Sequence, residues 1–187
     1  MIFNDMQDCL ERSPIIASIH ENQWQKVLTS PVEVIFHLKA KLLNIKKNIE
    51  EAHKHNKRIF VHIDLADGIG KDEAGIDYLA ACGVDGIIST RGPLIRHANQ
   101  IGLITVQRFF VLDSQGIQSI FNMLESSHPH YIEIMPGIAD KIIRRFSEGS
   151  FPIIAGGLIE TKQEVTSALS SGAVAVSTGT EELWHLV

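Results

Sequence analysis

The chain has 187 residues, of which 44% are hydrophobic and 21% charged, and its formal net charge is −5. This composition is typical of a globular domain with one core, and the negative charge weighs against a protein that coats nucleic acid through a generally basic surface. No apolar run approaches the roughly 18 residues needed to cross a bilayer, and the N-terminus lacks the pattern of a signal peptide. We therefore expect a cytoplasmic protein without membrane contact.

Apolar runs rich in Ile, Val and Phe alternate with amphipathic stretches along the whole chain, which is typical of repeated strand and helix units around a parallel sheet. Eight such runs are predicted to be strands, over residues 15–19, 32–38, 59–64, 86–90, 104–110, 131–135, 153–155 and 174–177. Helices are expected near residues 21–29, 40–55, 72–82, 93–101, 115–126, 138–148, 161–171 and 180–185.

This order predicts the α/β class and a small TIM-like (β/α)8 barrel, with residues 1–187 forming a single domain. The chain is slightly shorter than the roughly 200 residues usual for this fold, so we expect short loops and some short or missing helices. A doubly wound open sheet is the structural alternative. The regular spacing of eight runs favours closure into a barrel.

Two strand ends near the C-terminus carry small residues that suit phosphate binding. One is Gly156-Gly157, and the other is Thr178-Gly179-Thr180. Glycine lets the backbone approach an anion, and a following helix offers unpaired N–H groups and the positive end of its dipole. In (β/α)8 barrels a phosphate site often forms after strands seven and eight. A plain turn and a helix cap are the alternative interpretations, but the two together favour a phosphate site.

Strand periodicity predicts which polar side chains face the barrel interior. In residues 60–64 and 131–135 the apolar residues alternate with His62, Asp64 and Glu133, which should point inward. One of Gln107 and Arg108 should join them, because neighbours on a strand face opposite ways. These groups form either a hydrogen-bonded network that specifies the core or a ligand site, and carboxylates are rarely buried without a partner.

A basic cluster stands out against the acidic remainder of the chain. Between residues 39 and 58 there are seven basic and two acidic residues. Such a cluster is usually a solvated surface, but it is also the place where nucleic-acid phosphates would bind. The candidates for nucleic-acid binding, and for RNA binding under the family resemblance given below, are Lys39, Lys46, Lys47, Lys54, Lys57 and Arg58, with Lys141, Arg144 and Arg145 as a second group.

We expect no metal site and no catalytic triad. His53, His55, His128 and His130 lack metal-ligand spacing, and Ser89 and Ser177 have no nucleophile-elbow context. The two cysteines, Cys9 and Cys82, are expected to be free thiols.

Several longer stretches resemble the glycerol-3-phosphate-responsive antiterminators, also called glycerol uptake operon antiterminator regulatory proteins. The resemblance runs from about Ser13 to the C-terminus, and the stretches that carry it lie at residues 60–65, 85–91, 106–114, 132–137, 154–159 and 183–184. One departure is Gly179, where relatives often carry a polar side chain. Its N–H remains available to a phosphate.

The resemblance implies a regulator without catalysis or cofactor, which senses glycerol 3-phosphate and then binds and stabilises the leader mRNA of a glycerol-catabolism operon. It implies that the phosphate is held at Gly156, Gly157, Gly179 and Thr180, and inward polar residues would contact the glycerol hydroxyls. A homodimer would double the basic surface, although the sequence identifies no interface. The alternative is a barrel enzyme, a lyase or isomerase of a small phosphorylated metabolite, with Asp64 or Glu133 as base, His62 as acid or base and Arg108 stabilising charge.

Overall fold

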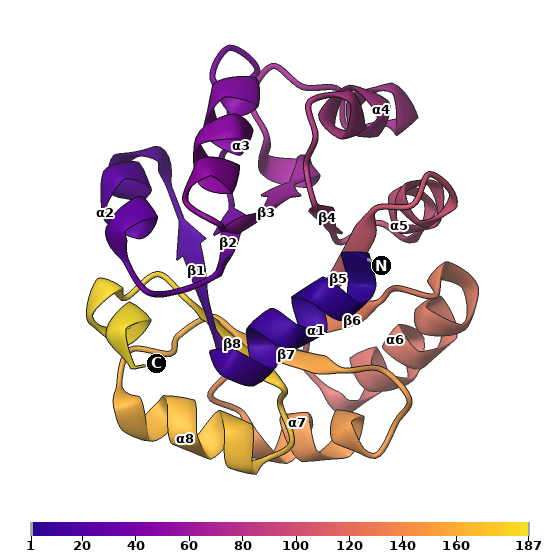
Figure 1. Cartoon of the computed structure of the whole chain (residues 1–187). Helices are drawn as coiled ribbons and strands as arrows, with labels where there is room; N and C mark the ends of the chain where they lie inside the picture. The colour runs from indigo at the N-terminus through magenta and orange to yellow at the C-terminus, as the bar shows by residue number, and fades with distance from the viewer. Residues whose placement is uncertain (1, 187) are drawn as a thin grey trace.

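Eight parallel strands close into a barrel in the computed structural model of the chain, which describes residues 2–186 (Figure 1). Consecutive strands pair in chain order, and the last pairs with the first. The strands are β1 (Ile15–Ile19), β2 (Val34–His37), β3 (Arg58–His62), β4 (Gly86–Ser89), β5 (Ile104–Phe110), β6 (Tyr131–Met135), β7 (Ile153–Gly156) and β8 (Ala175–Thr178). The predicted TIM-like (β/α)8 barrel is therefore confirmed, and the open sheet was the wrong alternative.

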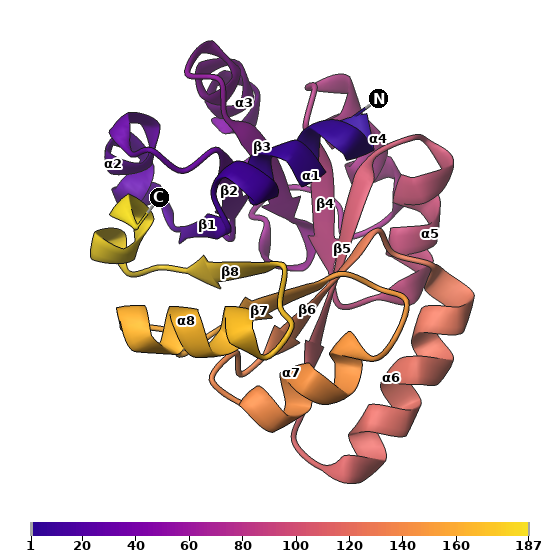
Figure 2. The same ribbon diagram turned by 60° about the horizontal axis from the view of Figure 1, so that its bottom comes forward.

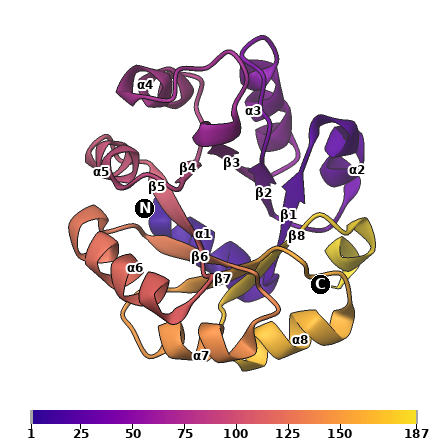
Figure 3. The ribbon, with the colours of Figure 1, turned by 180° about the vertical axis from the view of Figure 1, so that it is seen from behind.

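Helices surround the strands and cover their outer faces (Figures 1 and 3). The α-helices are α1 (Ile2–Arg12), α2 (Trp24–Thr29), α3 (Ile45–Lys54), α4 (Glu73–Ala81), α5 (Gly92–Gln100), α6 (Ser114–Ser127), α7 (Asp140–Ser147) and α8 (Lys162–Ser170). Three short 3-10 helices are η1 (Glu21–Gln23), η2 (Ile63–Leu65) and η3 (Glu181–His185). As expected for so short a barrel, the last unit ends in η3 instead of an α-helix.

Burial follows the alternation expected for a closed parallel barrel. In β3 the side chains of Ile59 and Val61 join the large core between strands and helices, while Phe60 belongs to a second cluster inside the barrel. Inward side chains from all eight strands contribute to that inner cluster. Apolar side chains thus fill the half of the barrel in which the strands begin, and the polar inward residues lie toward the carboxyl ends of the strands.

Helix α1 was not expected from the sequence. It crosses the end of the barrel where the strands begin, and it lies behind the strands in the opposite view (Figures 2 and 3). Its Met6, Cys9 and Leu10 are buried together with inward residues such as Phe36 and Tyr131. This helix therefore seals the N-terminal end of the barrel and completes the inner core.

The predicted helix over residues 40–55 begins only at Ile45. Residues 38–44 instead form a loop that pairs with the connection after β3. The Leu42 N–H donates to Asp67 O at 3.0 Å, and the Asp67 N–H donates to Ala40 O at 2.8 Å. Leu42 is consequently 39% exposed and is not part of the buried face of α3. Among the helices of the described residues, none is long and apolar enough to cross a membrane.

Candidate ligand site at the carboxyl ends of the strands

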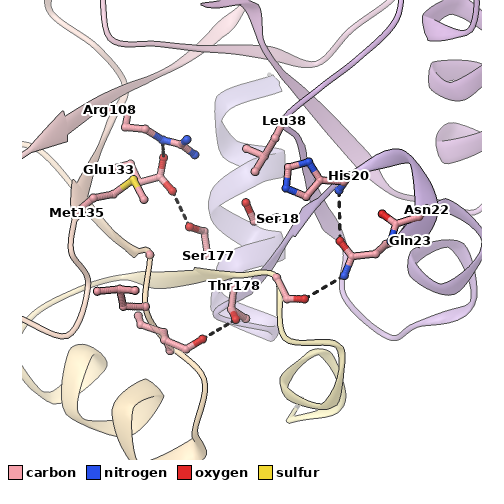
Figure 4. A pocket seen from close by; sticks show the side chains of 14 residues that line it. Ser18, His20, Asn22, Gln23, Leu38, Arg108, Glu133, Met135, Ser177 and Thr178 are labelled. Carbon is pink, nitrogen blue, oxygen red and sulfur yellow. Dashed lines mark hydrogen bonds and ion pairs between the residues drawn. The ribbon is translucent and has the colours of Figure 1, made fainter. Parts of the chain in front are cut away.

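A cavity of about 450 Å3 opens at the carboxyl ends of β1, β5, β6, β7 and β8 (Figure 4). Five of the residues predicted for the site line it, namely Arg108, Glu133, Gly157, Thr178 and Gly179. Arg108 and Glu133 are the charged residues of the lining, so their formal charges cancel. The lining of the cavity therefore has no net formal charge, although it contains several polar groups.

Arg108 and Glu133 form a buried ion pair at the floor of the cavity. They occupy paired positions of β5 and β6, and Arg108 Nε donates to Glu133 Oε2 at 2.6 Å. Only 7% and 1% of their side chains are exposed. A charge buried to this extent requires a partner. The pair leaves the remaining guanidinium N–H groups of Arg108 to serve a ligand.

Gly156 makes room for a second contact to Glu133. Ser177 of β8 reaches across β7 and donates to Glu133 Oε1 at 2.5 Å. A Cβ atom on Gly156 would lie 2.4 Å from that carboxylate oxygen and 2.7 Å from Ser177 Oγ. Gly156 was predicted to bind phosphate, but it is buried beneath the cavity. Its lack of a side chain instead allows the Ser177–Glu133 hydrogen bond.

The loop tips after β7 and β8 supply backbone donors. Gly157 and Leu158 both have positive φ, 77° and 60°. In the part of the chain that the structure describes, the N–H groups of Gly157, Leu158 and Gly179 donate no hydrogen bond. The N–H of Thr180, in contrast, donates to Thr178 Oγ1 at 3.1 Å. Three N–H groups of these tips are thus unpaired, a property that suits an anion.

Asp64 lies outside the cavity lining, contrary to the prediction of a shared interior. Its carboxylate accepts hydrogen bonds from Ser89 Oγ, the Thr90 N–H and hydroxyl, and Arg91 Nε. Burial acts to raise the pKa of Asp64, but these donors hold it below its ordinary value. The residue therefore fastens the connection between β4 and α5 and has little capacity left for a ligand.

His62 lies in the barrel interior and does not line the cavity. The residue is 2% exposed, and Nδ1 is buried without a hydrogen-bond partner, 4.0 Å from Asp64 Oδ2. Burial, assisted by the nearby Arg108 charge, lowers the pKa of His62 to about 4. The imidazole is therefore neutral at physiological pH.

Gln107 points away from the site. Of the pair at positions 107 and 108, Arg108 faces inward, and Gln107 accepts a hydrogen bond from Ser127 Oγ of α6 at 2.5 Å. Gln107 was predicted as a polar ligand contact alongside Arg108, but the period of two along β5 places it in the layer between strand and helix.

Sequence reasoning missed the contribution of the first two strands. Ser18, His20, Asn22, Gln23 and Leu38 line the cavity from β1, the β1–α2 connection and the end of β2 (Figure 4). Gln23 Nε2 donates to Gly179 O at 3.0 Å and so ties this connection to the tip after β8. The inward period of β1, through Ile16, Ser18 and His20, was the signal available in the sequence.

The predicted basic residues do not form one surface. Lys39, Lys46, Lys47 and Lys54 are exposed. Lys57 is 5% exposed, and its ammonium donates to Ser30 O at 2.7 Å and to Val32 O at 2.6 Å. Arg58 is half-buried and donates to Asp85 at 3.2 Å. Both residues lie where β3 begins, at the opposite end of the barrel from the cavity.

Among the described residues, no group of three or more His, Cys, Asp or Glu side chains is placed to hold a metal ion. Cys9 and Cys82 are free thiols, and burial is the main cause that raises the pKa of Cys9 to about 11.

The chain is similar to known proteins over most of its length. It is 31% identical over 180 residues to the uncharacterised protein YgcP of Escherichia coli K-12, covering 95% of this chain and 94% of that protein. The crystal structure of a glycerol uptake operon antiterminator regulatory protein from Listeria monocytogenes superposes with a TM-score of 0.87 at 32% identity, over 92% of this chain and 95% of that one.

A glycerol uptake operon antiterminator-related protein from Thermotoga maritima gives a TM-score of 0.82 at 30% identity, over 91% of this chain and 96% of that one. A putative deoxyribose-phosphate aldolase from Coccidioides immitis, at 9% identity and a TM-score of 0.74 over 94% of this chain and 84% of that one, shares the fold alone. The family model described as glycerol-3-phosphate responsive antiterminator matches residues 15–184. The chain therefore belongs to the family of glycerol-3-phosphate responsive antiterminators.

Proposed function

We propose that the cavity binds glycerol 3-phosphate and that the bound metabolite controls binding of the protein to the leader mRNA of a glycerol-catabolism operon. Family membership supports the metabolite. The observation that carries the site is the combination of three unpaired N–H groups, on Gly157, Leu158 and Gly179, with the Arg108–Glu133 pair on the floor of one cavity.

In this arrangement the phosphate rests on the backbone donors of the two loop tips. The hydroxyl groups of the glycerol end then meet Arg108, Glu133 and Ser177, which offer both donors and acceptors. Because the side-chain charges of the cavity cancel, a dianion is stabilised here by N–H dipoles and by the remaining guanidinium donors. The exposed lysines of the β2–α3 region supply the contacts to RNA phosphates.

Calorimetric titration tests the metabolite half of the proposal. Glycerol 3-phosphate should bind, whereas glycerol should bind at least about a hundredfold more weakly, because it lacks the anion that pairs with the loop tips. Comparable affinities for the two compounds would contradict a phosphate site at Gly157 and Gly179.

An RNA mobility assay with and without glycerol 3-phosphate tests the regulatory half. The metabolite should raise the affinity for a leader transcript. The aldolases among the structural neighbours make a barrel enzyme the competing hypothesis. If the metabolite leaves RNA affinity unchanged while product accumulates from a phosphorylated substrate, the protein is an enzyme.

A further inference from the structure

The connection between β2 and α3 exposes large apolar side chains beside lysines. Leu43 is 93% exposed and Leu42 39% exposed. Lys39, Lys46 and Lys47 are exposed on the same short segment, and residues 39–49 contain no acidic residue. We call Lys39, Leu42, Leu43, Lys46 and Lys47 the leucine–lysine surface.

The charge of this surface selects its partner. A second copy docking here through a two-fold axis would bring the same lysines face to face, and like charges in an interface are unfavourable. A looped or single-stranded RNA instead offers phosphates for the lysines and unstacked bases, whose apolar faces can pack on exposed leucines. RNA is therefore the partner that satisfies both components.

An ion pair and a hydrogen bond join the leucine–lysine surface to the wall of the cavity. Leu38 lines the cavity, and Lys39 follows it directly. Glu21 lies between the cavity residues His20 and Asn22, and its carboxylate accepts from Lys41 Nζ at 2.8 Å and from Asn44 Nδ2 at 3.2 Å. The loop that carries Leu42 and Leu43 is thus fastened at both sides to the wall of the ligand site.

We propose that the leucine–lysine surface is where leader RNA docks, and that Glu21 couples this surface to the occupancy of the cavity. The inference rests on the proposed function, and it adds the exposed leucines as contacts for RNA bases and Glu21 as the residue that transmits the ligand signal. A ligand that reorders the β1–α2 connection shifts Glu21, and Glu21 shifts the loop through Lys41 and Asn44. The ligand acts to the extent that it prefers one arrangement of this loop.

The surface is tested with Leu43→Ser and its matched control Leu112→Ser, an equally exposed leucine on the β5–α6 connection. Affinity for a leader transcript is measured by fluorescence anisotropy with saturating glycerol 3-phosphate. Leu43→Ser should weaken binding at least about fivefold without changing the salt dependence, since no charge is lost. Equal losses in both variants would overturn the assignment, as would a change in sedimentation mass confined to Leu43→Ser, which would identify a dimer interface.

The coupling is tested with Glu21→Gln and, as control, Glu50→Gln, which removes one negative charge from the neighbouring helix α3. The quantity measured is the ratio of RNA affinities with and without glycerol 3-phosphate. In Glu21→Gln this ratio should fall at least about fivefold toward unity, while calorimetry shows ligand affinity within about twofold of wild type. Glu50→Gln should keep the full ratio.

Failure of the inference differs from failure of the proposed function. If the wild-type protein shows no ligand-dependent RNA affinity, the proposed function is wrong. If the wild type responds to the ligand and Glu21→Gln responds equally, the function stands and the coupling through Glu21 is wrong.

Discussion

At the scale of single residues, the ion pair between Arg108 and Glu133 is both the most buried charge pair of the site and the most informative to dissect. Removing one partner of a buried pair leaves an uncompensated charge, whereas replacing both by apolar residues of similar size is often tolerated. A single substitution and a double substitution of the pair therefore separate its contribution to stability from its contribution to ligand binding.

We expect Glu133→Gln to lower the free energy of unfolding by about 3 kcal/mol, because the Arg108 guanidinium loses its counter-charge in the barrel interior. The double variant Arg108→Met with Glu133→Leu should unfold within about 1 kcal/mol of wild type, yet it should not bind glycerol 3-phosphate. Urea denaturation and calorimetric titration provide the two measurements. A double variant as unstable as the single one would show that hydrogen bonding, not unpaired charge, dominates.

Two buried histidines make stability dependent on pH. Both ring nitrogens of His37 are buried without a hydrogen-bond partner, and burial lowers the pKa of His37 from 6.5 to about 4. His62 is shifted to the same value. Because the unfolded chain binds these protons more readily, the contribution of each histidine is complete above pH 6.5 and is lost as the pH falls toward 4, by on the order of 3 kcal/mol each.

The variant His37→Phe should therefore be at least as stable as wild type at pH 7, since no hydrogen bond is lost. Between pH 7 and pH 5 it should lose roughly half as much unfolding free energy as wild type. Urea denaturation at both pH values measures the difference. His185→Gln, at an exposed position, serves as control, and a profile of His37→Phe parallel to that of wild type would refute the assignment.

At the scale of elements, the glycine-containing tips after β7 and β8 show what local sequence can and cannot predict. The small residues were visible, and their position after the last two strands predicted a shared place in space. The different structural roles of Gly156 and Gly157 were not predictable from the sequence, because these roles depend on neighbouring residues of β6 and β8. One glycine yields space to Glu133 and Ser177, and the next adopts positive φ beside Met135.

Gly157→Ala should lower stability about as much as alanine at another positive-φ glycine, but it should also weaken ligand binding. Its new Cβ would lie 2.5 Å from Met135 Cε, the movable end of a side chain that lines the cavity, whereas Gly102, with φ of 85°, has no atom within 4 Å of the same position. Gly102→Ala and Gly157→Ala should therefore each lose about 1 kcal/mol of unfolding free energy, and only Gly157→Ala should lose affinity for glycerol 3-phosphate. Thermal unfolding and calorimetry compare the variants, and an unchanged ligand affinity in Gly157→Ala would contradict a phosphate site at this loop tip.

The segment before α3, residues 38–44, forms a loop although its sequence pattern predicts a helix. The helical spacing of Leu38, Leu42 and Ile45 predicted a longer helix, but pairing of residues 40–42 with Asp67 fixes the segment as a loop. Tertiary hydrogen bonds between the two connections override the local helical pattern here. The same override exposes Leu43.

At the scale of the whole molecule, the barrel was predictable because eight apolar runs recur at regular intervals, and the period of two within them indicates the inward side. Helix α1 was missed, although Met6, Cys9 and Leu10 have helical spacing. A short amphipathic segment ahead of the first unit has no place in the repeated pattern. The role of α1 becomes evident only in the folded barrel, where the helix covers the end at which the strands begin.

Leu10→Ala should lower the free energy of unfolding by about 2–4 kcal/mol, because it removes buried contacts between α1 and the inner core. The affinity for glycerol 3-phosphate should stay within about twofold of wild type, since the cavity lies at the other end of the strands. Chemical denaturation and calorimetry measure both quantities. Met123→Ala, at a position 39% exposed on α6, is the control and should change neither. A parallel loss of affinity in Leu10→Ala would show that the two ends communicate.

The seal formed by α1 also has a kinetic consequence. With the lower end closed, a small molecule held among the strands has one route to solvent, and that route passes the rim where we place the nucleic acid. Under the proposed function, we expect a transcript bound at this rim to obstruct departure of the metabolite, so that the residence time of the small molecule lengthens in the ternary complex. We then expect the assembled complex to outlast a brief fall in the cellular concentration of its effector.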